Sequence, residues 1–142
     1  MPDLSQQTID RLVDAASEVR GRAHAPYSSF RVGAAVVDAN GRIFVGCNVE
    51  NASYGLSVCA ERHAVAAAVS AGGECIEGLA VVTDTSPPAS PCGACRQVLV
   101  EFGDFPVILA NLEGERIVTS VGSLLPDAFT PESLVKGQDS RG

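Results

Sequence analysis

Apolar residues in the first part of the chain recur at helical spacing. Between residues 4 and 21 they fall at Ile9, Leu12, Val13, Ala16 and Val19. This spacing is typical of a surface helix with one buried face, for which Asp3 or Ser5 is a candidate N-cap and Gly21 a stop signal. The pattern predicts an amphipathic helix over residues 4–21.

Two segments rich in β-branched residues come next, at residues 30–37 and 42–49. Asp38-Ala39-Asn40-Gly41 separates them, and an Asn-Gly pair between two such segments is a strong hairpin signal. We therefore expect an antiparallel pair of strands.

Residues 57–70 are rich in alanine, contain neither Pro nor Gly, and are followed by Gly72-Gly73. This composition predicts a helix, with Ser57 as a candidate N-cap. Residues 76–83 have the composition of a strand, and residues 85–90 that of a Ser/Pro loop. Ser90-Pro91 then offers an N-cap followed by Pro at the first helical position, so we expect a helix to about residue 102.

The last predicted elements are two short strands, at residues 106–110 and 116–119, on either side of a turn near Glu113-Gly114. Residues 124–129 could form a helical turn that Pro126 interrupts. The order helix, strand, strand, helix, strand, helix, strand, strand implies strand-helix-strand crossovers beside the first hairpin. We predict an α/β fold: a three-layer α-β-α sandwich around a mixed five-stranded sheet.

Length, composition and charge narrow the class of protein. A chain of 142 residues suits a single domain, which we assign to residues 1–129, followed by a polar tail at residues 130–142. The chain shows no apolar run of about 18 residues and no signal peptide at its start, so we expect a cytoplasmic protein with no membrane partner. A net charge of −7 makes nucleic acid an unpromising partner, because phosphate binding needs a basic surface.

Three cysteines and one carboxylate form a candidate catalytic zinc site. Cys92 and Cys95 are spaced to share one face of a helix, and Cys59 precedes Glu61 at the start of another. The positive ends of both helix dipoles would favour thiolates. Three protein ligands leave the fourth position of tetrahedral zinc open for water, as catalytic sites do.

Other interpretations of these residues remain open from the sequence alone. A thioredoxin-like redox pair at Cys92 and Cys95 would leave Cys59 and Glu61 without a role. His63 lies four residues after Cys59 and could be a fourth ligand, which would make the site structural. Glu61 would be on the opposite side of an ideal helix from Cys59, so a catalytic site requires Cys59 to precede the first helical residue.

Cys47 and Cys75 lie outside this constellation, and we interpret them as small hydrophobic residues. Arg62 has a possible role beside the zinc. Three thiolates on Zn²⁺ give a net charge of −1, and the adjacent guanidinium could donate hydrogen bonds to sulfur.

Zinc deaminases that act on cytosine or adenine rings carry the signature His/Cys-x-Glu followed by Pro-Cys-x-x-Cys. Cys59-Ala60-Glu61 and Pro91-Cys92-Gly93-Ala94-Cys95 fit it at every defined position. Between about Pro26 and Phe129 the chain resembles the small homotetrameric cytidine deaminases of pyrimidine nucleoside salvage. The resemblance rests on Pro26-Tyr27-Ser28-Ser29-Phe30-Arg31-Val32-Gly33-Ala34-Ala35, Gly46-Cys47-Asn48-Val49-Glu50-Asn51-Ala52-Ser53-Tyr54-Gly55, Cys59-Ala60-Glu61-Arg62, Ser90-Pro91-Cys92-Gly93-Ala94-Cys95-Arg96-Gln97-Val98-Leu99 and Leu124-Leu125-Pro126-Asp127-Ala128-Phe129.

The resemblance implies a cytidine deaminase-like fold and a role for each residue of the site. Cys59, Cys92 and Cys95 would bind one Zn²⁺ per subunit, and Glu61 would shuttle protons. Asn48 and Glu50 would hold the ribose hydroxyls; their alternation along a strand is consistent with this, because it puts both on one face. Phe30 and the backbone near Ala60 would hold the base. Phe129 would stack on the pyrimidine in a neighbouring subunit of the tetramer, and Tyr54 would line a subunit boundary.

We therefore expect hydrolytic deamination of cytidine and 2′-deoxycytidine to the uridines, with release of ammonia. A deaminase of a modified nucleoside or a cytosine-containing antibiotic is the nearest alternative. A nucleic-acid editor is disfavoured by the acidic composition. The chain departs from the family pattern at His63, where a small residue is usual, and in its longer tail.

Overall fold

The centre of the fold is a mixed five-stranded sheet, described in a computed structural model for residues 3–134. The strand order is β2-β1-β3-β4-β5. Only β3 and β4 run parallel, and the other neighbouring pairs are antiparallel. The strands are β1 (Gly33–Asp38), β2 (Ile43–Cys47), β3 (Ile76–Thr83), β4 (Pro106–Asn111) and β5 (Arg116–Ser120). The predicted mixed sheet is confirmed.

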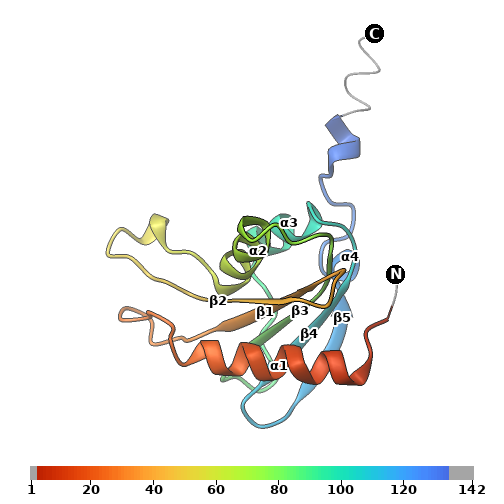
Figure 1. The fold of residues 1–142 in the computed structure, drawn as a ribbon. Coiled ribbons are helices and arrows are strands. Elements are labelled where there is room, and N and C mark those ends of the chain that lie inside the picture. The colour runs from red at the N-terminus through yellow and green to blue at the C-terminus, as the bar shows by residue number, and fades with distance from the viewer. Residues whose placement is uncertain (1–2, 135–142) are drawn as a thin grey trace.

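Helices cover both faces of the sheet, as Figure 1 shows. On one face lies α1 (Gln6–Arg20), and on the other lie α2 (Ala60–Ser70) and α3 (Gly93–Val100). Two short helices, η1 (Tyr54–Leu56) and α4 (Val121–Leu124), complete the described elements. The predicted three-layer arrangement is therefore confirmed.

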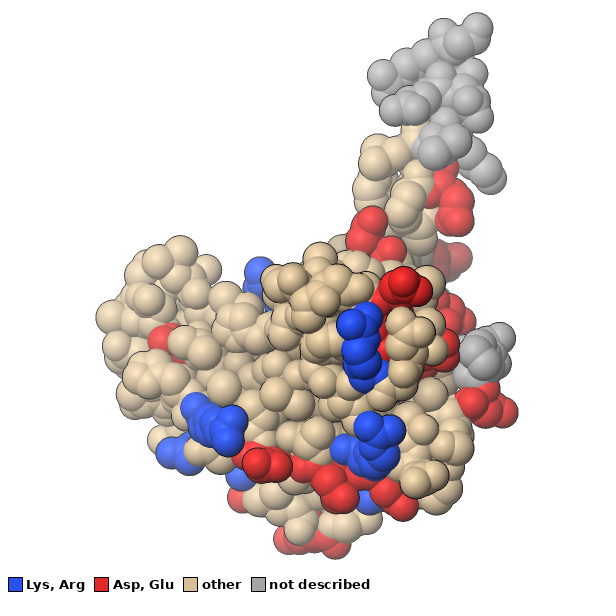
Figure 2. All heavy atoms as spheres, viewed as in Figure 1, with Lys and Arg blue, Asp and Glu red and all other residues tan. Residues whose placement is uncertain are grey.

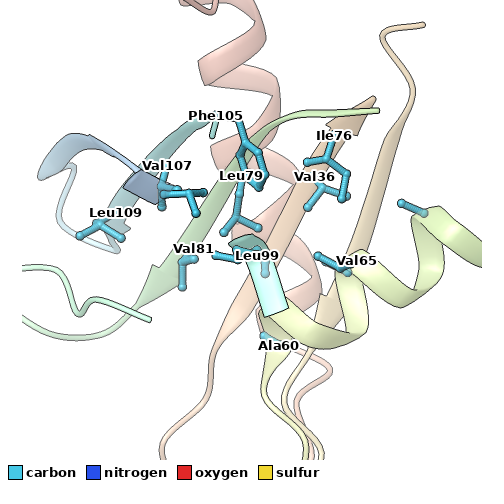
Figure 3. Packing of buried hydrophobic residues seen from close by; sticks show 14 of the residues in the cluster. Val36, Ala60, Val65, Ile76, Leu79, Val81, Leu99, Phe105, Val107 and Leu109 are labelled. Carbon is cyan, nitrogen blue, oxygen red and sulfur yellow. The ribbon is translucent and has the colours of Figure 1, made fainter. Parts of the chain in front are cut away.

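The central strands are buried on both faces, so their side chains alternate between two hydrophobic cores. On β3, Leu79 and Val81 belong to the core under α2 and α3, drawn in Figure 3, whereas Ala80 and Val82 belong to the core under α1. The core under α1 is completed by Leu12, Val13, Ala16, Ala35, Val37, Ile108 and Ala110. This double burial fixes the position of β3, whose carboxyl end at Thr83 lines the same cavity as Cys59 and Cys92.

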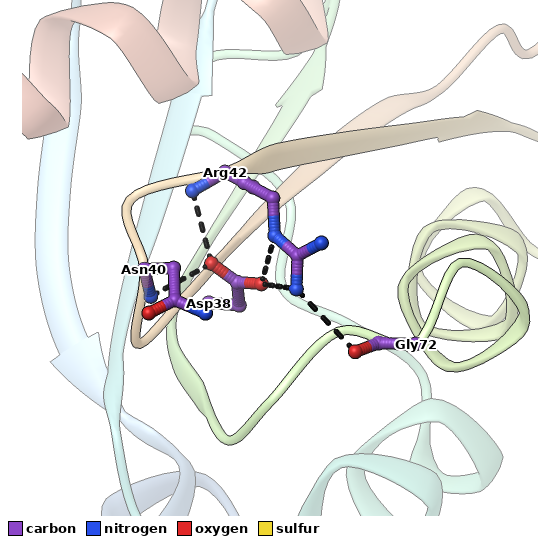
Figure 4. Close-up of polar contacts among 4 residues, drawn as sticks. All are labelled: Asp38, Asn40, Arg42 and Gly72. Carbon is purple, nitrogen blue, oxygen red and sulfur yellow. Dashed lines mark hydrogen bonds and ion pairs between the residues drawn. The ribbon is translucent and has the colours of Figure 1, made fainter.

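The β1–β2 hairpin is closed by the side chain of Asp38, which is 1% exposed. Its carboxylate accepts hydrogen bonds from the backbone N–H groups of Asn40 and Arg42, and it pairs with the Arg42 guanidinium at 2.9 Å (Figure 4). Gly41 has φ +77°, which glycine adopts without strain. Arg42 also donates to the carbonyl of Gly72, so the turn is tied to the end of α2.

The N-cap of α1 is Ser5, whose Oγ accepts from the Thr8 N–H at 3.1 Å. The caps predicted for the other two helices are wrong. α2 begins after Cys59, because Ser57 instead accepts from the N–H of Asn51 and Val58 pairs with Val49. α3 begins after Cys92.

Ser90 has a different role from the cap that we expected. Its Oγ accepts from the guanidinium of Arg96, which also donates to the carbonyl of Pro91. These bonds hold residues 90 and 91 outside the helix, so Pro91 is not its first residue.

Four further expectations are corrected. β1 begins at Gly33 rather than at residue 30, and β2 ends at Cys47 rather than at residue 49. The helical turn expected at residues 124–129 lies earlier, because α4 ends at Leu124, two residues before Pro126. Cys75 is exposed, so it is not a buried hydrophobic residue.

Within residues 3–134, no helix combines the length and the hydrophobicity that crossing a membrane requires. The predicted polar tail is described only as far as residue 134, where residues 131–134 form a helical turn. Its remainder, residues 135–142, lies outside the described residues, and the division into a domain at 1–129 and a tail stays a prediction.

Candidate active site

The three cysteines of the predicted zinc site meet where α2 and α3 begin. Cys59 and Cys92 are the N-cap residues of these helices, with extended backbones (ψ 155° and 169°), and Cys95 lies in the first turn of α3. The Cys59 Sγ is 3.9 Å from the Cys92 Sγ, which is 3.4 Å from the Cys95 Sγ. All three sulfurs lie within 4.8 Å of one another, so the cluster can hold a metal ion.

The pKa values of Cys59 and Cys95 are shifted in opposite directions. Contact with Cys95, together with Cys92 and the charges of Arg62 and His63, outweighs burial and lowers the pKa of Cys59 to about 6. The pKa of Cys95 is raised, first by its contact with Cys59 and then by burial. A thiolate is therefore available at Cys59 near neutral pH, and thiolate is the form that binds zinc.

His63 does not join the three thiols. Its Nδ1 lies 2.8 Å from the carbonyl oxygen of Cys47, on β2, and the metal-competent cluster found among residues 3–134 contains the three cysteines alone. Because Cys59 precedes the helix, Glu61 can lie beside it even though ideal helical spacing would separate them. The geometric condition for a site with an open fourth position is met.

Glu61 is 5% exposed and borders a cavity of about 180 Å³. Burial raises the pKa of its carboxyl, and the negative charge of Cys59 raises it further. We call this space the Glu61 cavity. It is lined by Phe30, Val32, Asn48, Cys59, Ala60, Glu61, Val81, Thr83, Ala89, Ser90 and Cys92. A carboxyl, two thiols and an aromatic ring therefore face one small, largely apolar space.

The side chain of Asn48 fixes the backbone of Phe30 and Val32, two residues that line this cavity. Its Oδ1 accepts from the N–H of Val32 at 2.8 Å, and its Nδ2 donates to the carbonyl of Phe30 at 2.7 Å. The side-chain amide thus takes the place of a neighbouring strand, which explains why β1 starts only at Gly33. Within residues 3–134 the Nδ2 group donates this one hydrogen bond, which leaves its second N–H for another acceptor.

Glu50 borders a second hollow rather than the Glu61 cavity, together with Tyr27, Ser28, Tyr54 and Ser57. Its carboxylate accepts from the Ser28 hydroxyl and from the N–H groups of Tyr27 and Ser28. The Ser28 hydroxyl, followed by these N–H groups, holds the pKa of Glu50 below its ordinary value. The Ser28 Oγ also accepts from the N–H of Phe30, so a hydrogen bond joins one lining residue of each hollow.

Two predicted contact residues lie away from the Glu61 cavity in this chain. Tyr54 is 74% exposed and meets the edge of Tyr27, with ring centres 5.7 Å apart. Phe129 is 60% exposed, and its carbonyl accepts from Gln97. Arg62 is half-buried, and among the described residues it donates no hydrogen bond to a thiol.

Several residues of the cavity were not predicted as site residues. Thr83 ends β3, and its Oγ1 accepts from the N–H of Ala89, which fixes the loop that leads to Cys92. A polar residue at the end of an apolar strand is a signal that could have indicated Thr83. The sequence carried no comparable signal for Val32, Val81 or Ala89, which line the cavity with apolar side chains.

Comparison with known families agrees with this geometry. Residues 6–111 match the model of the "Cytidine and deoxycytidylate deaminase zinc-binding region". The chain belongs to the cytidine deaminase family. This stretch includes all three cysteines and Glu61.

Relatives in the family match nearly the whole chain. A cytidine deaminase of Sporosarcina psychrophila is 48% identical over 128 residues, which are 89% of this chain and 94% of that protein. A probable cytidine deaminase of Dictyostelium discoideum is 44% identical over 133 residues, 93% of this chain and 90% of that protein.

Solved cytidine deaminase structures share the fold. The crystal structure of the enzyme from Burkholderia pseudomallei has a TM-score of 0.82 at 50% identity, covering 89% of this chain and all of that one. The structure from Mycobacterium tuberculosis has a TM-score of 0.74 at 40% identity, covering 89% and 98%.

Proposed function

We propose that this chain is a zinc-dependent cytidine deaminase, which hydrolyses cytidine and 2′-deoxycytidine to uridine and 2′-deoxyuridine in pyrimidine salvage. The observation that carries the proposal is the convergence of three thiols and a buried carboxyl on one cavity, in a chain of this family.

The donor set fits zinc. Cys59, Cys92 and Cys95 offer three sulfur ligands from two helix starts, and Cys59 ionises readily. Zn²⁺ bound by three protein ligands supplies a water whose pKa falls toward about 7. The positive charge of Arg62 offsets the excess negative charge of three thiolates, which is the role that we propose for this residue.

Glu61 moves the protons. Its carboxylate takes one proton from the attacking water and delivers it to N3 of the pyrimidine, while the water oxygen bonds to C4. The remaining proton of that water, now on the C4 hydroxyl, passes through Glu61 to the amino nitrogen. The C4–N bond then breaks, the oxygen on C4 becomes the carbonyl of uridine, and ammonia leaves. Burial raises the pKa of the Glu61 carboxyl, so this group holds a proton more readily than an exposed glutamate does, as a group that accepts and releases protons requires.

The remaining residues bind and orient the substrate. Phe30 and the backbone at Ala60 hold the base in the Glu61 cavity, and Asn48 donates its free N–H to the ribose. Glu50 binds the ribose at the second hollow, where hydrogen bonds from Ser28 and Tyr27 lower the pKa of its carboxylate and favour the ionised form. A site that binds the ribose hydroxyls favours free nucleosides as substrates over a cytosine-containing antibiotic.

A homotetramer is part of the proposal. Tyr54 and Phe129 are large and exposed and do not line the Glu61 cavity of their own chain, and Val69 is exposed on the alanine-rich α2. Burial of such side chains between subunits would let Phe129 stack on a neighbour's substrate and Tyr54 line a boundary. The cytoplasmic location stays a prediction.

Nucleic acid is not proposed as a partner. On the face drawn in Figure 2, basic side chains stand in separate groups among acidic and uncharged ones, whereas binding to a phosphate backbone needs a continuous basic surface.

Zinc-loaded protein tests the proposal directly. It is expected to convert cytidine to uridine with one ammonia released per turnover, to lose activity with a chelator, and to regain it with Zn²⁺. If the protein converted neither cytidine nor 2′-deoxycytidine, the proposal would be contradicted. Turnover of a modified cytidine alone would favour the alternative deaminase.

A further inference from the structure

His63 makes a hydrogen bond that the proposed mechanism does not use. The residue lies in the first turn of α2, and its Nδ1 is 2.8 Å from the carbonyl oxygen of Cys47 at the end of β2. A carbonyl oxygen can only accept, so the Nδ1 carries the hydrogen. The bond joins α2, which begins after Cys59, to the strand that leads into Asn48.

The Cys47 carbonyl belongs to the same peptide group as the N–H of Asn48. That N–H donates to the carbonyl of Val32 at 3.2 Å, on the side of β1. In a planar trans peptide the N–H and the C=O point in opposite directions, so the Cys47 carbonyl faces the outer edge of the sheet. Val32 and His63 therefore hold this one peptide from its two sides.

The helix and the strand meet at Gly46 with no side chain between them. A Cβ on Gly46 would lie 2.7 Å from the carbonyl oxygen of Ala60 and 2.7 Å from the Cβ of His63, closer than real contacts allow. Backbone contact at Gly46 sets the separation of α2 and β2. The hydrogen bond from His63 fixes the orientation of the peptide group between Cys47 and Asn48.

The peptide held by His63 carries Asn48, which shapes the Glu61 cavity. The Asn48 amide is already bonded to Val32 and Phe30, so a rotation of its backbone would move the cavity wall as well as the amide. Glu61, in the first turn of α2, and Cys59, the N-cap that precedes it, lie at the helix end of the same connection.

We propose that His63 is a positioning residue for deamination, which holds Asn48 at a fixed place relative to Glu61. The inference rests on the proposed function, because it assumes that Asn48 contacts the nucleoside. The hydrogen on Nδ1 is the feature required. Asn at position 63 can place a side-chain N–H near this point, whereas Gln places its N–H farther along the side chain.

The test compares His63→Asn with His63→Gln in the zinc-loaded enzyme, by the KM and kcat for cytidine, the affinity for uridine, and the zinc content. His63→Gln is expected to raise KM and weaken uridine binding about tenfold, the effect of one hydrogen bond, with kcat nearly unchanged. His63→Asn is expected to stay within about twofold of the wild type in KM, and both variants to keep the zinc.

Several outcomes would overturn the inference. Unchanged KM and uridine affinity in His63→Gln would show that the bond positions nothing. Equal impairment of both variants, together with equal losses in unfolding midpoint, would assign His63 a structural role alone. Loss of zinc from both would make it a ligand. A wild type that is inactive on cytidine and 2′-deoxycytidine would instead contradict the proposed function.

Discussion

The side chain of Asn48 donates from Nδ2 to the carbonyl oxygen of Phe30 at 2.7 Å, and this bond shapes the Glu61 cavity. Residues 30–32 run alongside β2 without belonging to the sheet, because the amide of Asn48 satisfies their backbone groups. The aromatic wall of the Glu61 cavity therefore depends on one buried amide.

Asn48→Asp tests this dependence with the smallest change of shape. The carboxylate keeps the acceptor for the N–H of Val32 but sets a second oxygen against the carbonyl of Phe30. An unpaired buried charge is costly, so we expect the free energy of unfolding to fall by about 1–3 kcal/mol and kcat/KM for cytidine to fall at least about tenfold.

Asn40→Asp, in the β1–β2 turn, is the matched control because the Asn40 side chain is exposed and remote from the cavity. It is expected to keep wild-type kinetics. Wild-type KM and stability in Asn48→Asp would contradict the role given to the amide. Urea unfolding and steady-state kinetics measure both quantities.

Removal of one thiol tests the metal donor set. Cys92→Ser replaces a thiolate with a hydroxyl that ionises far less readily, so the purified protein is expected to lose most of its zinc and its activity. Cys75→Ser changes an exposed cysteine outside the cluster and should leave the zinc content at the wild-type value. Elemental analysis distinguishes the two, and full zinc occupancy in Cys92→Ser would show that the donor set is wrong.

The carboxylate of Asp38 makes the free energy of unfolding depend on pH in the acidic range. Burial alone would raise its pKa, but the N–H groups of Arg42 and Asn40 and the Arg42 guanidinium outweigh burial and hold the pKa below its ordinary value of 3.8. A lowered pKa in the folded state stabilises the fold above the unfolded-state pKa, and this contribution is lost as the pH falls through the folded-state value.

Asp38→Asn is therefore expected to lower the urea midpoint at neutral pH and to make it less sensitive to pH below about 4. Asp14→Asn, which removes an exposed carboxylate from α1, should keep the wild-type dependence. If the urea midpoint of Asp38→Asn fell in acid as steeply as that of the wild type, Asp38 would not be the source of the pH dependence.

Close contact between α1 and β1 requires glycine at position 33. A Cβ there would overlap the carbonyl oxygen of Ala16 and lie 2.8 Å from the backbone nitrogen of Arg20. We expect Gly33→Ala to lower the free energy of unfolding by about 1–3 kcal/mol, as overpacking does. At Gly55 a Cβ would meet no atom within 4 Å, so Gly55→Ala should be nearly neutral. Equal unfolding midpoints in urea for the two variants would contradict this contact.

The elements of the fold were predictable because periodicity is a local property of the sequence. The strand over residues 76–83 was predicted with its observed bounds, since both of its ends coincide with a change from apolar to polar residues. Ends determined by distant side chains were not predictable. Serine is a common N-cap residue, so Ser57 and Ser90 were expected to cap helices. Their hydroxyl oxygens instead accept hydrogen bonds from the backbone N–H of Asn51 and the guanidinium of Arg96.

The thiol cluster was predictable for a related reason. The Cys-x-x-Cys spacing and Pro91 mark a helix start, and the structure brings Cys59 to the same point. The orientation of His63 was not predictable, because its partner is a backbone carbonyl 16 residues earlier. The subunit contacts of Tyr54 and Phe129 stay predictions.

Glu61→Gln tests the central claim most directly, through zinc content and turnover measured on the same preparation. Glutamine keeps the shape of the side chain but cannot carry a proton between water and the pyrimidine. We predict one zinc per chain, as in the wild type, and a loss of at least about 100-fold in kcat for cytidine, the contribution of general acid–base catalysis. Wild-type turnover in zinc-loaded Glu61→Gln would contradict the account.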